Sequence, residues 1–445
     1  MATYALGRLG VPISALRNAP TLSSKLLTVA NSFRRQLRTK GLLNLCGEKR
    51  IIHSRLMMAK THGTSTATFA EGDGTYLTKP VEFVRNIRIN GRIDIGADAG
   101  GGTMKIGIIY ATHEGTRKFI PLLVRKGGDK YDDLAALCTP NLTPFAEESS
   151  RFENIFQVLQ FLIDDNEEVL LVGDYKFISS VIGHMGASSN HPCFVCDIPK
   201  ENLASKGRVR SQRNNPSMSH TPLLKISPQR IVPPVLHLFL GIANKIIKNA
   251  LPKYLDPNLI MQQIRMVRTI HTTAGGGLAD LHDLNGSELR RFIKKGCVAK
   301  LLIATPQPQP GDVAASMDGS LRLMAIPLLQ HWLEDLYPFL LDRQEWNKDR
   351  ITHFQALVDE IHRTWLLTTS SPLFPKLHML HHCVDFVKRY NFLGSASESP
   401  IESFHATYNA LYDQHHLNSA RNDPERLRRC LADVACAAMA AFVKL

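Results

Sequence analysis

The chain has 445 residues, of which 44% are hydrophobic and 21% charged, an ordinary composition for a globular protein of two or three domains. Lysine and arginine exceed aspartate and glutamate by 13 charges, which favours a polyanionic partner such as nucleic acid. Eight cysteines are too few for a disulfide scaffold and favour a reducing compartment, and no apolar run approaches the ~20 residues of a membrane span, so no membrane partner is expected.

Residues 1–80 are predicted to form a basic helical arm followed by a polar linker. Residues 1–47 contain no acidic residue, and the densest basic stretch contains Arg34, Arg35 and Arg38. This composition is typical of a helix that binds the DNA backbone, and also of a mitochondrial presequence. DNA binding agrees better with the rest of the chain, so we expect a nuclear protein, with a mitochondrial one as the alternative.

The first part of the globular core is expected over residues 81–198, beginning with a strand, a turn and a strand between residues 88 and 110. Asp98 lies at the exit of the first strand, and the glycines at 100–102 allow the backbone to approach a ligand or a neighbouring strand closely. The apolar run 119–124 predicts a third strand. Pro121 would place it at an edge of the sheet, because proline has no N–H to donate.

The run Val169 to Val172 predicts a buried strand that follows a helix over residues 150–162. This strand ends at Asp174, so its carboxylate should lie at the C-terminal end of the strand, where open α/β sheets bind their ligands. A helix should follow. Beyond it, Cys193 and Cys196 have the separation of a zinc knuckle.

Residues 199–372 are predicted to form a basic loop and then a helical insertion without strands. In this loop, up to about residue 230, a basic run between residues 206 and 213 is opposed only by Glu201, and its cations could bind phosphates. They are Lys206, Arg208, Arg210 and Arg213.

A zinc-binding helix and a helix that completes the core are expected over residues 373–420. His378 and His382 are four residues apart and therefore lie on one face of the first helix. The second helix contains Glu402. Residues 421–445 predict a C-terminal helix with Asp423 at its N-cap.

Three carboxylates stand out as candidates for chemistry: Asp98, Asp174 and Glu402. Carboxylates brought together favour divalent cations, and two Mg²⁺ or Mn²⁺ ions could activate a water or a 3′-hydroxyl for attack on a phosphodiester. The alternative is three unrelated surface carboxylates, of which one is an N-cap and one a turn residue.

Cys193, Cys196, His378 and His382 form a Cys₂His₂ set of the type that binds Zn²⁺ tetrahedrally. Such a site would link the loop after the second carboxylate to the helix before the third. The alternative is a pair of buried apolar cysteines and an unrelated pair of surface histidines.

Several ordered motifs resemble one known family. The stretch 173–176, the helix after it and the stretch 192–197 resemble that family's segment with its second catalytic Asp and first zinc pair. Residues 235–244 resemble its Leu-His-x-x-x-Gly helix, and residues 284–291 its Asn-Gly-x-x-x-Arg stretch. The family is the catalytic core shared by the V(D)J recombination-activating protein and the Transib transposases.

This resemblance implies an α/β, RNase H-like mixed sheet flanked by helices, with an Asp-Asp-Glu triad and a helical zinc-binding insertion. It implies that Glu402 is the catalytic glutamate, with Glu398 as its competitor, and that Asp98 is the first aspartate, with Asp94 as its competitor. It implies DNA nicking and strand transfer by a homodimer, with DNA contacts from His237, Arg290 and Arg291. No sequence-specific DNA-binding domain is recognisable at the N-terminus.

Two other functions remain open at this point. One is a catalytically silent, zinc-stabilised DNA-binding or interaction protein derived from a transposase. The other follows from the run Asp98-Ala-Gly-Gly-Gly-Thr, which also looks like the first phosphate loop of sugar kinases and actin-type ATPases. That family needs a second phosphate loop, for which Gly275 to Gly277 is the only candidate, and it would leave both zinc pairs unexplained.

Overall fold

The computed structural model describes residues 74–76, 80–81, 84–85, 91–100, 103–112, 117–138, 152–211, 215–253, 255–268, 283–297, 300–301, 327–328, 330–369, 372–405 and 408. The chain divides into two units, Met1–Thr64 with Tyr408–Leu445 and Ser65–Thr407, and the description below concerns the second. The basic N-terminal arm, the glycines at 275–277 and the C-terminal helix expected from the sequence lie outside the described residues.

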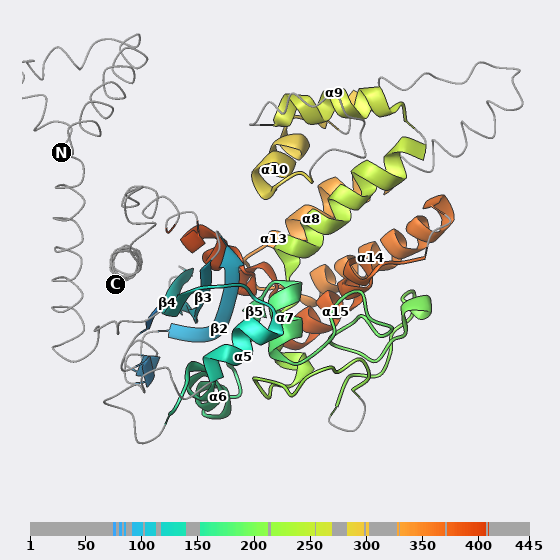
Figure 1. Cartoon of the computed structure of the whole chain (residues 1–445). Coiled ribbons are helices and arrows are strands. Elements are labelled where there is room, and N and C mark those ends of the chain that lie inside the picture. The colour runs from blue at the N-terminus through green and yellow to red at the C-terminus, as the bar shows by residue number, and fades with distance from the viewer. Residues whose placement is uncertain are drawn as a thin grey trace, which may run out of the picture. The chain divides into compact units, whose positions relative to one another are not determined.

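A five-stranded mixed sheet forms the core of this unit, with strand order β1-β4-β3-β2-β5 (Figure 1). Its strands are β1 (Gly74–Tyr76), β2 (Gly91–Gly100), β3 (Thr103–Thr112), β4 (Arg117–Lys126) and β5 (Leu171–Gly173). Strands β2, β3 and β4 are antiparallel to one another, whereas β5 runs parallel to β2. The chain is therefore a mixed α/β protein, as the sequence predicts at this coarser level.

The third predicted strand, β4, is not an edge strand as the sequence suggested, because β1 pairs with its outer side through Leu123 to Arg125. Pro121 is tolerated because it lies outside that pairing and opposite Gly107, where the register between β3 and β4 shifts. The two backbones approach closely at this bulge. A Cβ on Gly107 would lie 2.1 Å from the carbonyl oxygen of Ile120, so only glycine fits there.

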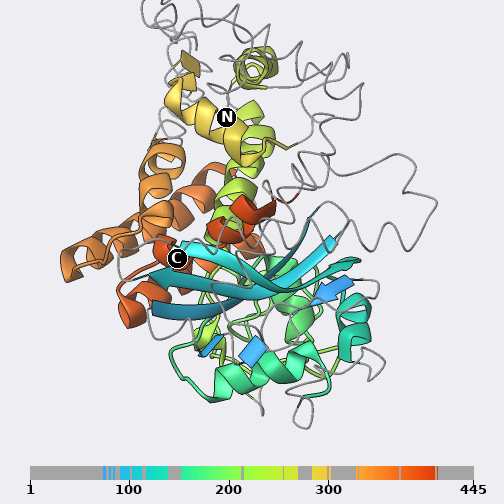
Figure 2. The ribbon, with the colours of Figure 1, turned by 90° about the vertical axis from the view of Figure 1, so that its left-hand side faces the viewer.

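Helices cover both faces of the sheet (Figure 2). Helix α6 (Ile155–Asp164) lies on one face, and its N-cap, Asn154, accepts a hydrogen bond from the backbone of Gln157. The short helix 399–405, red in the figure, lies on the other face. A Cβ on Gly96 of β2 would lie 2.9 Å from Ile401, so glycine allows this helix to pack directly on the strand.

The described residues between 235 and 390 contain helices and no strand, as the sequence predicts. The α-helices are α8 (Val235–Lys245), α9 (Pro257–Val267), α10 (Gly286–Lys294), α13 (Leu336–Leu341), α14 (Lys348–Thr369) and α15 (Pro375–Tyr390). Ile246–Ala250 and Gln330–Asp335 are π-helical. Two shorter helices, α5 (Tyr131–Ala135) and α7 (Tyr175–Val181), belong to the sheet region. None of the described helices is long and apolar enough to cross a membrane.

Candidate metal centres

The three candidate carboxylates come from three separate segments of the fold. Asp98 lies near the end of β2, Asp174 directly follows β5, and Glu402 lies on the helix 399–405. Strands β2 and β5 are parallel neighbours, with Ala97 paired to Gly173, so the two aspartates leave the sheet at the same edge. The helix that carries Glu402 packs over β2 through Ile401, as described above.

Asp98 and Glu402 lie closest together, with ligand atoms within 4.8 Å of each other in a group that does not include Asp174. Burial, together with the negative charges of Asp174 and Glu402, raises the pKa of Asp98 from 3.8 to about 7. Burial also raises the pKa of Glu402, again with a contribution from Asp174. Like charges held together in this way favour a cation among them.

Asp174 is also an N-cap, which is the structural alternative that the sequence left open. Its Oδ1 accepts a hydrogen bond from the backbone N–H of Phe177 at 2.6 Å, which begins helix α7. Asp98 makes a similar local contact, since its Oδ1 accepts from the backbone of Ala99 at 2.8 Å. Each of these two contacts uses only one of the two oxygens of its carboxylate.

His405 is a fourth side chain at this centre, and the sequence reasoning missed it. Its Nδ1 lies 3.4 Å from Oδ2 of Asp98. Asp98, Glu402 and His405 each offer one ligand atom, and these atoms all lie within 4.8 Å of one another. The signal in the sequence is the i, i+3 spacing of Glu402 and His405, which places both on one face of a helix.

Glu398 and Glu402, which the sequence left in competition, have different surroundings. The side chain of Glu398 is 3% exposed, and its Oε1 accepts hydrogen bonds from His237, at 3.0 Å from the backbone N–H and 3.1 Å from Nδ1. Glu402 is 38% exposed, and its Oε1 lies 3.7 Å from Nε2 of the same histidine. Glu398 therefore holds His237 in place, whereas Glu402 is accessible beside Asp98.

His237 and Lys105 are two cations at this centre. Burial opposes the charge of His237, but the hydrogen bond to Glu398 and the nearby carboxylates raise its pKa to about 9. Lys105 lies opposite Asp98 in the β2–β3 register and is buried, which lowers its pKa to about 8 against the opposing effect of Asp98 and Glu402. Both are charged at neutral pH and offset part of the carboxylate charge.

Asp94, the competitor of Asp98, has a structural environment. Its side chain is fully buried, forms an ion pair with Arg92 at 2.9 Å and accepts a hydrogen bond from the backbone N–H of Leu170 at 3.4 Å. These contacts connect β2 to the segment before β5. Both oxygens of Asp94 are therefore engaged within the sheet, and Asp98 is the aspartate that faces Glu402.

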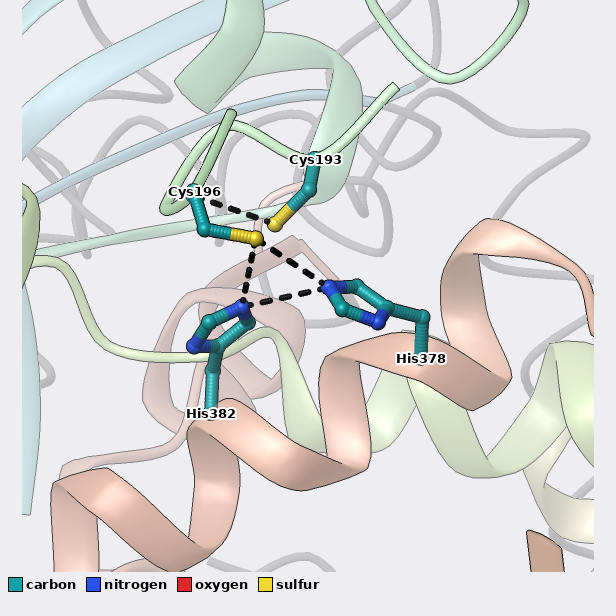
Figure 3. A group of neighbouring side chains, drawn as sticks. All are labelled: Cys193, Cys196, His378 and His382. Atoms are coloured by element: carbon teal, nitrogen blue, oxygen red, sulfur yellow. Dashed lines mark hydrogen bonds between the residues drawn. The ribbon is translucent and has the colours of Figure 1, made fainter. Parts of the chain in front are cut away.

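The second centre is the buried cluster of Cys193, Cys196, His378 and His382 (Figure 3). The thiols come from the loop after α7, and the imidazoles project from one face of α15 toward them. The Sγ of Cys196 lies 3.3 Å from Nε2 of each histidine, and the two Nε2 atoms are also 3.3 Å apart.

The separation of the two imidazole nitrogens fits a tetrahedral metal. Zn–N bonds of ~2.0–2.1 Å imply an edge of about 3.3–3.4 Å between two imidazole nitrogens on one ion, which is close to the separation found. Two thiols and two imidazoles are also the donor types that zinc prefers. The cluster could thus bind a metal such as zinc.

Neighbouring groups orient both imidazoles for this purpose. The Nδ1 of His378 donates to the carbonyl oxygen of Leu203 at 2.9 Å, which leaves Nε2 free to act as a ligand. The Nδ1 of His382 lies 3.5 Å from Asp385, which in turn pairs with Lys206 at 2.7 Å. Hydrogen bonds from Cys193 and from both histidines lower the pKa of the Cys196 thiol, which favours the thiolate that a metal binds.

The basic loop differs from the sequence prediction at Arg210, which is 4% exposed and cannot face a nucleic acid. Its guanidinium donates to the carbonyl oxygens of Cys193 at 2.7 Å and His191 at 3.0 Å, so it holds the cysteine loop in place. Lys206 and Arg208 are exposed but have acidic partners, Asp385 and Asp197 respectively.

The other predicted DNA contacts are placed as follows. Arg290 is exposed on α10 and Arg291 is half-buried, whereas His237 belongs to the carboxylate centre. The remaining predicted contacts, Arg34, Arg35, Arg38 and Arg213, lie outside the described residues.

The fold and these two centres define a mixed α/β protein with a buried cysteine and histidine cluster that could bind a metal. The chain matches no protein-family model and no curated protein sequence.

Proposed function

We propose that this protein is a divalent-metal-dependent enzyme that nicks DNA and transfers the cut strand, with Asp98, Asp174 and Glu402 as its Asp-Asp-Glu triad. The observation that carries this proposal is that Asp98 and Glu402 lie with their ligand atoms within 4.8 Å of each other. Asp174 leaves the same edge of the sheet from the neighbouring strand, and its charge helps to raise the pKa of both carboxyl groups. The mixed sheet, in which antiparallel β2, β3 and β4 are joined by parallel β5, supports an RNase H-like fold.

In this proposal the carboxylates hold two Mg²⁺ or Mn²⁺ ions, which supply activation of a water or 3′-hydroxyl and stabilisation of the leaving oxygen. Asp98, Asp174 and Glu402 would be the residues that hold these ions. Lys105 and His237 offset the carboxylate charge before ions arrive. Glu398 fixes the ring of His237 beside Glu402.

We further propose that the Cys₂His₂ cluster binds Zn²⁺ as a structural ion. The support is its burial, its donor set and its place between two segments that flank the triad: the cysteines follow Asp174, and α15 precedes Glu402. A zinc ion there would fix the distance between these segments. The partner is DNA, and a nuclear, homodimeric enzyme is the form that the resemblance implies.

One observation favours a second candidate, a zinc-stabilised DNA-binding protein without catalysis. Lys105 and His237 already place two positive charges beside the three carboxylates. Such compensation would allow the carboxylates to remain together without divalent ions. The experiment below distinguishes the two candidates.

Asp174→Asn is the variant that tests the proposed enzyme. Asparagine is as good an N-cap as aspartate, so helix α7 and the melting temperature should be preserved. Nicking of duplex DNA in Mg²⁺ or Mn²⁺ should be abolished. The control is Asp349→Asn, which alters an exposed aspartate in the first turn of α14 and should leave nicking unchanged.

Undiminished nicking by Asp174→Asn would contradict the proposed triad. Absence of nicking by the parent protein, with DNA binding intact, would favour the non-catalytic candidate.

A further inference from the structure

Glu402 and His405 form a Glu-x-x-His pair on the helix 399–405, and this pair faces a carboxylate from a strand. The i, i+3 spacing places both side chains on one face of the helix. Asp98 supplies the third group, and the three ligand atoms lie within 4.8 Å of one another. This arrangement combines two oxygen donors with one nitrogen donor.

The state of the His405 side chain points independently to a ligand. The side chain is 9% exposed, and its Nδ1 lies 3.4 Å from Oδ2 of Asp98. Its Nε2 is buried and has no hydrogen-bond partner among the described residues. A buried polar atom without a partner costs free energy, so an imidazole in this position is expected to serve a bound species.

The imidazole of His405 offers one ring nitrogen as a ligand atom of this group. A neutral imidazole has a lone pair available for a metal ion. The negative charge that attracts the ion comes from Asp98 and Glu402.

We propose that Asp98, Glu402 and His405 form a binding site for a first-row transition ion, with Mn²⁺ as the probe of that class, in preference to Mg²⁺. The inference rests on the proposed function for the role of Asp98 and Glu402, and it adds the identity of the ion. Mg²⁺ selects oxygen ligands in a strict octahedron and dehydrates reluctantly, whereas imidazole nitrogen suits transition ions. A histidine at this position therefore changes the metal preference of the carboxylate centre.

Mn²⁺ binding to the full-length, zinc-loaded protein without DNA tests this site. Pulsed electron paramagnetic resonance should show coupling of bound Mn²⁺ to a directly coordinated ¹⁴N nucleus. The His405→Gln variant should lose that coupling and bind Mn²⁺ at least about tenfold more weakly, as expected when one ligand is removed. Mn²⁺ should also resist displacement by an equal concentration of Mg²⁺.

His237→Gln is the matched control, because His237 is the other imidazole beside Glu402. Its Mn²⁺ complex should keep the nitrogen coupling. Asp98→Asn should weaken Mn²⁺ binding even if His405→Gln fails to fold, which keeps the site testable. Coupling that persists in His405→Gln, or disappears in His237→Gln, would overturn the proposal, as would displacement of Mn²⁺ by an equal concentration of Mg²⁺.

These outcomes are separate from those of the nicking assay. If the protein binds Mn²⁺ through nitrogen but does not nick DNA, the proposed metal site stands and the proposed function fails. If it nicks DNA and its bound Mn²⁺ has no nitrogen ligand, the proposed function stands and this metal site fails.

Discussion

The contacts of each residue at the carboxylate centre decide its role: Asp94 is held within the sheet, whereas Asp98 faces Glu402 and His405. Asp98 and Asp174 follow short apolar runs, so their position at the ends of strands could be inferred from pattern alone. The choice between Asp94 and Asp98 could not, because both occur on one strand. Only the pairing of Asp94 with Arg92 and with the backbone of Leu170 separates them.

For a similar reason, His405 could not be identified as a candidate ligand from the sequence. A single histidine on a helix face is more often a satisfied core residue than a ligand. What changes that interpretation is the approach of Asp98 from a strand about 300 residues earlier in the chain, which no local pattern contains.

The His237–Glu398 pair predicts a pH-dependent contribution to stability. The pKa of His237 is raised from 6.5 to about 9, so the folded state binds this proton more tightly than the unfolded chain does. The resulting stabilisation is fully present below about pH 6.5 and is lost as the pH rises through about 9. Glu398→Gln should therefore reduce the free energy of unfolding by about 2 kcal/mol near pH 6 and by much less near pH 10.

Urea unfolding of the parent and of Glu398→Gln at the two pH values would measure this difference. His237→Gln should remove most of the pH dependence of the difference, because the titrating group is then absent. A stability loss of equal size at both pH values would contradict the proposed role of the pair.

At the scale of elements, each pair of candidate metal ligands could be predicted from the sequence, but the contact between the two pairs could not. Cys193 and Cys196 have a recognisable spacing, and His378 and His382 share a helix face. Their combination depends on α15 lying against the loop after α7, which the structure shows through contacts such as that of Cys196 with His378. The sequence also could not predict that the strand containing Pro121 lies inside the sheet. The short strand β1 and the bulge opposite Gly107 have no distinct sequence pattern.

Cys193→Ser is expected to release one metal ion per chain and to destabilise the protein, because a structural zinc contributes to folding directly. Zinc content measured by mass spectrometry and the melting temperature should fall together. Cys383→Ser is a suitable control, since this buried cysteine lies next to His382 in the chain but outside the cluster. Full retention of zinc by Cys193→Ser would refute the proposed ligand set.

At the scale of the whole molecule, the excess of 13 positive charges predicts electrostatic binding to DNA. The logarithm of the association constant should fall linearly and steeply with the logarithm of salt concentration, since lysine and arginine displace counterions from phosphates. Arg290→Ala should make this slope shallower by about 1 if the exposed Arg290 contacts a phosphate.

Arg210→Lys would not test DNA binding, because the guanidinium of Arg210 supports the cysteine loop. Fluorescence anisotropy with a labelled duplex at several salt concentrations would measure the slope. Affinity independent of salt would remove the charge excess as evidence for a DNA partner.

The most direct measurement is anomalous diffraction from crystals of the zinc-loaded protein grown with Mn²⁺ and a DNA duplex. The proposed function predicts manganese peaks about 3.5–4 Å apart among Asp98, Asp174 and Glu402, and a zinc peak between the two cysteines and two histidines. Density that places Glu402 away from Asp174, or that leaves the carboxylates without manganese while the ion binds elsewhere, would contradict it.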